Sequence, residues 1–364
     1  MCMSIYTLIM IKKKLLNKNT TEKKAVYSKK AENIFTIKVN KSIEILIVPS
    51  LGDKNTHQEN VGIVLEENDI LRILSKRYNK VVITCIKNKN DLIKLVERKP
   101  DLVFSGVKFF NFGHEQLWLN DFLETYNIPY IGSNTTSLNN ESNKDKAKEI
   151  VLRAGVKTAE FFIAEPGQYN SLKKLPIAFP FFIKPLKGGD SRGVDNDSIC
   201  YNYKSFKKKV LDIKNKYNLS SIIETYLSGK EYSVGIFQES ITGNLTAMPI
   251  EIITKKNING HCILDYDIKK NDEETVTAVT DTKVFNELIE IGKKSFTALG
   301  GKSFGRIDVK MNHLGEAHFM EANLMPGLRK GYFYRSCKLN LNINYDEMIL
   351  NIANTGLTSN NIRH

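Results

Sequence analysis

Residues 305–323 read GRIDVKMNHLGEAHFMEAN, two short apolar runs on either side of a turn at residues 312–315. Short apolar runs bounded by turn residues favour β-strands, so we expect two strands that form an antiparallel pair. Asp308 then lies on the first strand, and Glu321 and Asn323 lie on one face of the second, because strand residues two apart point the same way.

Three oxygen donors converge on this predicted strand pair. Asp308, Glu321 and Asn323 suit Mg²⁺, a hard cation that keeps waters and substrate phosphates as its other ligands. Arg306 shares the face of Asp308 and can stabilise a phosphoryl oxygen or an oxyanion. The alternative is a pair of surface acids, but a carboxylate among apolar strand residues is costly without a partner. We therefore favour the metal site.

A glycine-rich loop precedes this pair in the chain. The segment FFIKPLKGGDSRGV places Lys184 at the end of a strand and Gly188, Gly189 and Gly193 in the loop that follows. Glycines let backbone N–H groups close on an anion, and the lysine adds a positive charge for phosphate. Taken alone, the segment is explained equally well by a plain hairpin turn.

Two acids flank a predicted hinge, and a lysine follows in a loop. In IIETYLSGKEYSVGIF, Glu224 ends one strand and Glu231 begins the next, so the two can contact an adenine amine and a ribose hydroxyl. An exposed edge with solvated acids is the alternative. Lys269 in LDYDIKK can cover a nucleotide from a mobile loop, although a solvated surface lysine explains that segment better when it is taken alone.

The N-terminal half alternates strand and helix patterns. The predicted strands are 43–48, 80–86 and 101–107, with helical patterns at 70–74 and 92–96. This alternation predicts βαβ units and a parallel sheet. A polar stretch at 134–143 predicts a linker. Further elements are predicted as a helix at 144–154, strands at 179–183, 221–224 and 232–237, and a helix at 284–299.

The composition is that of a globular protein. The chain has 364 residues, of which 41% are hydrophobic and 26% charged, and 53 Lys+Arg against 40 Asp+Glu give a net charge of +13. A chain of this length usually forms two or three cores. Lysines are interleaved with acids, so we expect a solvated basic surface and no nucleic-acid partner. The five cysteines are far apart, which fits a reducing cytoplasm better than a disulfide framework.

Residues 1–41 are predicted to be a poorly ordered basic leader. Its apolar run at 1–11 is too short to span a bilayer, so we expect no membrane partner. Three lysines follow that run, whereas a secretory signal carries its positive charge before the apolar stretch.

Taken in order, the four features resemble those of the ATP-grasp ligases, and in particular of the D-alanine–D-alanine ligases and their relatives. The resemblance covers residues 42–353 and is strongest after residue 144. It implies an α/β (α+β) fold class, with an N-terminal parallel-sheet domain at 42–136. Two nucleotide-gripping domains would follow, a central one at 137–227 and a C-terminal one with the Mg²⁺ site at 228–355.

The resemblance also implies a role for each motif residue. The ATP phosphates would be contacted by Lys144, Lys184, Gly188 and Gly189, the adenine by Glu224, Tyr226 and Leu227, and the ribose by Glu231. Two Mg²⁺ ions, for which Mn²⁺ can substitute, would be held by Asp308, Glu321 and Asn323. The catalytic set would be Arg306, Lys269, Asp190, Ser191 and Lys270. The implied reaction makes an acyl phosphate from a carboxylate and ATP, and an amine then displaces the phosphate to form an amide.

The amino-acid half departs from the family pattern. The family's Gly-Gly-x-Ser-x-Glu motif, whose glutamate binds the first amino group, is replaced by VPSLGDKNTHQENVG, where Glu59 or Asp53 would substitute. The two loop serines of the family fall at Asp190 and Ser191, and the tyrosine that partners the first serine falls at Lys270. We therefore hypothesise an Asp190–Lys270 ion pair; two solvated side chains are the alternative.

The acceptor side is also altered. The family serine expected to bind the acceptor carboxylate falls at Tyr332, and Arg329, Lys330 and Arg335 cluster around it. This basic cluster predicts an acceptor with a free carboxylate, and a solvated basic loop is the alternative.

The leading hypothesis is an ATP- and Mg²⁺-dependent carboxylate–amine ligase that joins amino acids or short peptides. One alternative is a D-alanine–D-alanine ligase of cell-wall synthesis. Another is an ATP-binding interaction protein without catalysis, against which the intact Asp308, Glu321, Asn323 and Arg306 argue. The resemblance implies a homodimer.

Overall fold

The structure is a computed structural model that describes residues 38–47, 62–63, 65–189, 191–239, 242–257 and 260–358. Most of the predicted leader, Glu59, Asp53, Asp190 and the side chain of Lys270 lie outside the described part, so the Asp190–Lys270 pair stays a prediction. Over the described ranges, none of the helices is both long and apolar enough to cross a membrane. The four cysteines among these residues are free thiols.

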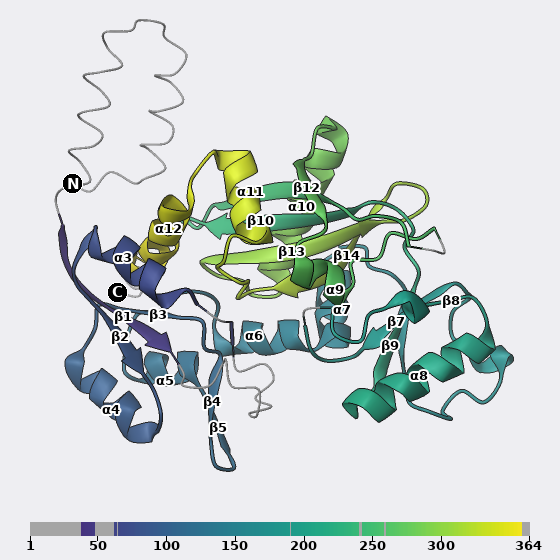
Figure 1. Cartoon of the computed structure of the whole chain (residues 1–364), viewed down its shortest axis with the longest axis horizontal. Helices are drawn as coiled ribbons and strands as arrows, with labels where there is room; N and C mark the ends of the chain where they lie inside the picture. Colours follow the sequence, from purple (N-terminus) through teal and green to yellow (C-terminus); the bar gives the residue numbers. More distant parts are fainter. Residues whose placement is uncertain are drawn as a thin grey trace, which may run out of the picture.

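The N-terminal part is a three-stranded parallel sheet flanked by helices (Figure 1). Its elements are β1 (Val39–Ile47), α3 (Glu67–Ser75), β2 (Tyr78–Cys85), α4 (Lys89–Arg98), β3 (Leu102–Ser105), the hairpin β4 (Phe109–Phe112) and β5 (Glu115–Trp118), and α5 (Leu119–Thr125). The strand order is β2-β1-β3, and β1 pairs in parallel with both neighbours. The prediction of βαβ units is confirmed, because parallel neighbours need a crossover and the helices supply it.

Two elements were predicted wrongly, and the first is the expected mobile loop around Lys269, which is the helix α9 (Tyr266–Asn271). The second is the polar stretch at 134–143, which is a helix, α6 (Thr135–Ser142), and not a linker. The Asn134 side chain caps it by accepting from the Ser137 N–H at 3.0 Å, and the Ser137 hydroxyl donates to the Gly300 carbonyl at 2.7 Å. Leu138 is fully buried. A cap and tertiary contacts thus hold a helix whose sequence has weak intrinsic propensity.

The central part is a four-stranded antiparallel sheet in the order β6-β9-β7-β8, and α8 packs against it. Its elements are α7 (Lys144–Arg153), β6 (Phe161–Ala164), the 3₁₀ turns η1 (Leu172–Lys174) and η2 (Asn196–Ser198), β7 (Phe181–Pro185), β8 (Ile199–Cys200), α8 (Tyr203–Tyr217) and β9 (Ser221–Thr225). The predicted helix at 144–154 and the predicted strands at 179–183 and 221–224 are confirmed within two residues.

The C-terminal part is a five-stranded antiparallel sheet in the order β12-β11-β10-β13-β14. Its elements are β10 (Glu231–Gln238), β11 (Leu245–Ile253), α9 (Tyr266–Asn271), β12 (Thr275–Ala278), α10 (Thr282–Ala298), β13 (Phe304–Met311), β14 (Ala317–Asn323), α11 (Tyr332–Leu341) and α12 (Tyr345–Thr358).

Two helices cover opposite faces of this sheet. A Cβ on Gly235 of β10 would lie 2.8 Å from Ser336 of α11, so only glycine allows that approach. The adjacent strand residue, Val234, contacts Gly292 of α10. Because adjacent strand residues point to opposite faces, α11 and α10 pack on different sides.

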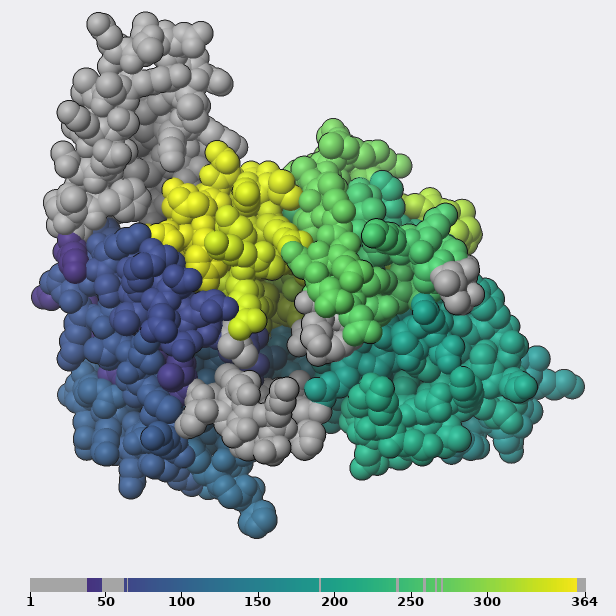
Figure 2. Space-filling view, in the orientation of Figure 1, coloured from purple at the N-terminus to yellow at the C-terminus, as the bar shows by residue number. Residues whose placement is uncertain are grey.

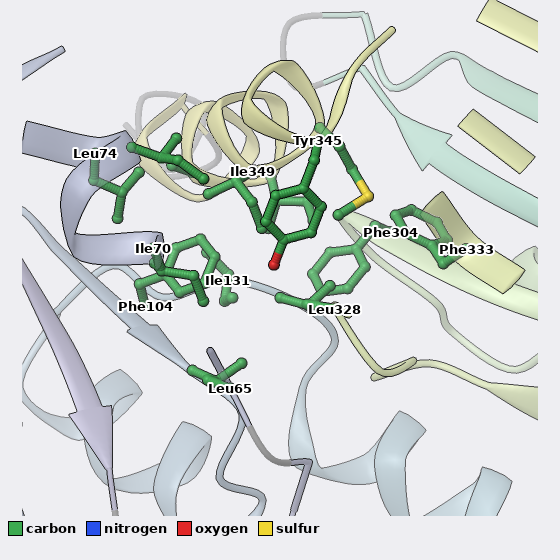
Figure 3. Packing of buried hydrophobic residues seen from close by; sticks show 14 of the residues in the cluster. Leu65, Ile70, Leu74, Phe104, Ile131, Phe304, Leu328, Phe333, Tyr345 and Ile349 are labelled. Atoms are coloured by element: carbon green, nitrogen blue, oxygen red, sulfur yellow. The ribbon is translucent and has the colours of Figure 1, made fainter. Parts of the chain in front are cut away.

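One hydrophobic core joins the N-terminal and C-terminal parts. In Figure 3, Ile70 and Leu74 of α3 lie near Ile349 of α12, and Phe304 and Phe333 of the C-terminal part complete the cluster. The residues of α12 therefore share a core with β1 and α3, and in Figure 2 the yellow end of the chain lies against the blue N-terminal part. The predicted C-terminal domain at 228–355 stays a prediction. Its last helix, α12, packs against the N-terminal part.

Candidate active site

A pocket lies between the central and C-terminal sheets, which meet as the teal and green regions of Figure 2. Twelve of the residues singled out from the sequence line it: Lys144, Lys184, Gly188, Gly189, Ser191, Glu224, Tyr226, Leu227, Glu231, Lys269, Asp308 and Glu321. The four predicted motifs, which are far apart in the sequence, therefore meet in one place.

Glu224 lies between two buried lysines. Its Oε1 is 2.8 Å from the Nζ of Lys148 on α7, and its Oε2 is 3.1 Å from the Nζ of Lys184 on β7. All three side chains are less than a tenth exposed. Burial alone would raise the pKa of Glu224, but the two lysines outweigh it and lower that pKa to about 2. The carboxylate is therefore ionised at every physiological pH.

The sequence analysis missed Lys148. It follows Lys144 by four residues on the same helix, so both project from one face, and that spacing was the available signal. Its Nζ also donates to the Thr158 hydroxyl at 2.6 Å, and Thr158 donates to the Phe319 carbonyl of β14 at 2.8 Å. Lys148 thereby connects α7 to both walls of the pocket.

Four cations act electrostatically on Glu321. Its pKa is lowered even though burial would raise it, because Lys184, Lys269, Lys144 and Arg306 favour the carboxylate. Such a gathering of positive charge in a buried pocket is typical of a site for a polyanion.

The predicted strand pair is confirmed. Asp308 pairs with Glu321 and Arg306 pairs with Asn323 across β13 and β14, with an irregularity in register immediately after Asp308. Asp308 accepts a hydrogen bond from the Ser233 hydroxyl at 2.7 Å. The sequence analysis did not single out Ser233.

The side chains predicted to bind Mg²⁺ are of the right chemical kind, but in this structure Asp308 contacts Arg306 and Asn323. Arg306 binds both Asp308 oxygens, at 2.9 and 2.8 Å, and the Asn323 amide nitrogen lies 3.4 Å from Oδ2. Among the described residues, no three His, Cys, Asp or Glu side chains form a metal cluster, and the role of Asn323 as a third donor stays a prediction. Two carboxylates and one amide leave room for waters and phosphates, as Mg²⁺ requires.

The glycine loop and the segment after β11 touch across the pocket. The Ser191 hydroxyl donates to the Leu264 carbonyl at 2.9 Å, and Lys310 lies 2.9 Å from Glu231 and 3.4 Å from the Cys262 carbonyl. Residues 262–264 line the pocket and were not predicted. These contacts join the two walls of the pocket.

The predicted acceptor residues lie outside this pocket. Tyr332 begins α11, and its ring centroid is 5.4 Å from the Arg306 guanidinium carbon. Arg329 lies 2.8 Å from Glu66 of the N-terminal part, and Lys330 lies 5.9 Å from the centroid of the Tyr345 ring. Their role in binding an acceptor stays a prediction.

A lysine-lined pocket between two antiparallel sheets, with an acidic strand pair as one wall, is the arrangement that defines an ATP-grasp enzyme. Comparison with known proteins agrees. The family model described as "D-ala D-ala ligase C-terminus" matches residues 150–354. The D-alanine–D-alanine ligase of Aquifex aeolicus is 30% identical over 239 residues, which are 65% of this chain and 75% of that protein.

Two further comparisons extend over more of the chain. The D-alanine–D-alanine ligase B of Clostridium perfringens is 25% identical over 279 residues, or 74% of this chain and 85% of that protein. The crystal structure of the Bacillus anthracis D-alanine–D-alanine ligase with ATP superposes with a TM-score of 0.64 at 18% identity, over 89% of this chain and all of that one. The chain belongs to the D-alanine–D-alanine ligase family, whose members are ATP-grasp carbon–nitrogen ligases.

The pKa of Lys144 predicts a pH dependence for nucleotide binding. Burial lowers this pKa to about 8, and its Nζ donates to the Gly188 carbonyl at 2.5 Å. We expect the affinity of the free protein for Mg·ATP to fall as the pH rises through about 8, because a neutral amine no longer attracts phosphate. Calorimetric titrations on both sides of this pH measure the effect.

Lys144→Arg should remove that dependence, because a guanidinium keeps its charge at higher pH. Lys157→Arg is the matched control, since Lys157 pairs with Glu316 on the surface. A wild-type affinity that stays constant through this pH range would contradict the assignment.

Proposed function

We propose that this protein is an ATP-dependent ligase that joins the carboxylate of one amino acid or short peptide to the amine of another. The observation that carries the proposal is the pocket lined by three lysines and two carboxylates, with Arg306 bound to one of the carboxylates: Lys144, Lys184, Lys269, Asp308 and Glu321. A triphosphate supplies the negative charge that such a cluster binds, and two carboxylates and an amide suit its accompanying Mg²⁺.

The reaction has two steps. An oxygen of the donor carboxylate forms a bond to the γ-phosphorus of ATP while the bond to the bridging oxygen breaks, and ADP leaves. The acceptor amine then attacks the acyl carbon and loses a proton, and inorganic phosphate leaves as the amide forms. Both steps need charge neutralisation and positioning more than covalent chemistry from the protein.

The residues divide this work. Lys144 and Lys184 would bind phosphate oxygens, Lys269 the terminal phosphate, and Arg306 the tetrahedral intermediate. Asp308, Glu321 and Asn323 would hold Mg²⁺, which supplies positive charge against the phosphates when it is bound. The contact between Ser191 and Leu264 would hold the glycine loop over the bound nucleotide, which would limit the access of water to the acyl phosphate.

D-alanine–D-alanine ligation is the second candidate, and the names of the relatives favour it. Against it stand the altered amino-acid residues, among them Tyr332 in the place of a family serine. A cytoplasmic location, two Mg²⁺ ions that Mn²⁺ can replace, and a homodimer are also part of the proposal.

Measuring ADP release across pairs of amino acids, with mass spectrometry of the product, tests the function. Turnover with several amino acids or peptides is expected. A strict requirement for D-alanine would establish the second candidate. No Mg²⁺-dependent turnover with any pair would favour a nucleotide-binding protein without ligase activity and refute the proposal.

Arg329 gives a prediction about the acceptor. We expect Arg329→Gln to raise the acceptor KM about tenfold with little change in kcat, because a guanidinium that binds the acceptor carboxylate contributes equally before and during the reaction. Glu66→Gln is the matched control, since it frees Arg329 from its present partner and should not raise KM. If both variants behave alike, Arg329 serves only as a structural link to Glu66.

A further inference from the structure

The helix α9 carries Lys269, and contacts within the helix fix its two ends. The Asp265 side chain accepts from the Ile268 N–H at 2.9 Å at the start. At the other end, Asp272 adopts a left-handed conformation with φ of 56°, and its N–H bonds to the Ile268 carbonyl. These local bonds define the helix but do not determine where it lies relative to the pocket.

Arg335 connects the end of α9 to the body of the protein. Its Nη2 lies 2.5 and 2.7 Å from the two carboxylate oxygens of Asp272. Its Nη1 lies 3.5 Å from Oε1 of Glu274, which precedes β12. One guanidinium therefore bridges two acids in the turn between α9 and β12, with Nη2 on Asp272 and Nη1 on Glu274.

The helix that carries Arg335 is firmly held. Phe333, Ser336 and Cys337 of α11 are buried, and α11 packs against the sheet at Gly235. The first residue of α11, Tyr332, lies against Arg306. The bridge thus connects α9 to the same rigid helix that contacts the proposed catalytic arginine.

The two acids differ in their surroundings. The Asp272 side chain is 66% exposed, whereas the Glu274 side chain is 2% exposed and also interacts with Tyr332 at the start of α11. A buried carboxylate needs a neighbouring cation, and Arg335 is placed to supply it. Glu274 contacts the guanidinium from the interior, and Asp272 contacts it from the exposed side.

We propose that Arg335 is a positioning residue that holds α9, and with it Lys269, over the nucleotide pocket. The sequence analysis placed Arg335 in a basic cluster that binds the acceptor, whereas its two acidic partners fit a role in closing the site over ATP. The expected effect on the kinetics rests on the proposed function, because it requires that the protein uses ATP. The structural consequence, a fixed α9, is measurable in the absence of turnover.

Hydrogen–deuterium exchange and kinetics on the full chain with Mg·ATP test the proposal. In Arg335→Met, amide exchange over residues 266–272 should rise about tenfold, and kcat/KM for ATP should fall about tenfold or more, because Lys269 is no longer held over the phosphate. Arg335→Lys should recover part of both effects, since a lysine keeps the charge but has only one nitrogen to contact the two acids.

Asp272→Asn is the second variant, because it removes the exposed partner and leaves Glu274 paired. It should raise exchange over the same residues, and the double variant with Arg335→Met should add little to either single change. The matched control is Arg72→Met, which breaks an exposed arginine–aspartate pair on α3, 3.3 Å from Asp69, and should leave exchange over 266–272 unchanged.

Unchanged exchange over 266–272 in a folded Arg335→Met or Asp272→Asn protein would overturn the inference. Failure of the proposed function has a different signature. The wild type would then show no ADP release with any amino acid, yet the exchange of α9 would still differ between wild type and Arg335→Met.

Discussion

Replacing Glu321 by glutamine should lower ligase turnover by about a thousandfold, with the fold intact. Glutamine has the same shape but no charge, so it is a poor ligand for Mg²⁺ and leaves Lys184 and Lys269 without their shared carboxylate. The apparent affinity for Mg²⁺ should fall together with kcat. ADP release as a function of Mg²⁺ concentration measures both.

Glu316→Gln is the matched control for that variant. Glu316 precedes β14 on the same hairpin, but it pairs with Lys157 on the surface, 2.8 Å away. We expect turnover within about twofold of wild type, in keeping with the small effect of exposed pairs. Near-normal turnover and Mg²⁺ dependence in Glu321→Gln would remove the metal site from this strand pair.

Replacing Glu224 by glutamine should lower the free energy of unfolding by about 3–5 kcal/mol at neutral pH, because Lys148 and Lys184 would remain buried without their carboxylate. Nucleotide affinity should fall as well, since Glu224 lines the pocket and keeps Lys184 in place. Urea unfolding and calorimetric titration with ATP measure the two losses.

The pH dependence of this loss follows from the pKa of Glu224. Folding lowers that pKa from 4.5 to about 2, so the contribution is fully present above pH 4.5 and is lost as the pH falls towards 2. The difference in the free energy of unfolding between wild type and Glu224→Gln should therefore become smaller as the pH falls from 4.5 towards 2. Glu149→Gln on the exposed face of α7 is the control. It should change the free energy of unfolding by less than about 0.5 kcal/mol. Equal stability of wild type and Glu224→Gln at neutral pH would contradict the assignment.

The sequence predicted those parts of the site that depend on local pattern. The strand pair at 305–323 is defined by its own periodicity, so the pattern alone placed Asp308 and Glu321 on facing strands. The order of the four motifs then indicated the fold. What was missed lies in short or polar elements, such as the four-residue strands of the β4–β5 hairpin and the helix α6, which tertiary contacts stabilise.

Pairing between charged side chains was harder to predict than their presence. Arg329 and Arg335 are neighbouring cations in the sequence, which gives no sign that Glu66 pairs with the first and that Asp272 and Glu274 pair with the second. Arg329 and Glu66 are 263 residues apart in the sequence (329 − 66), so only the fold brings them together. The same holds for the position of Lys148 beside Glu224.

The shared core of α12 and the N-terminal sheet has a consequence for synthesis. Ile43 of β1 and Ile349 of α12 belong to one cluster although 306 residues separate them, from 349 − 43. At about 5–20 residues per second, the ribosome needs about 15–60 s to make that interval. The nascent N-terminal strands therefore emerge long before their covering helix exists, so the apolar face that α12 covers stays exposed during that time.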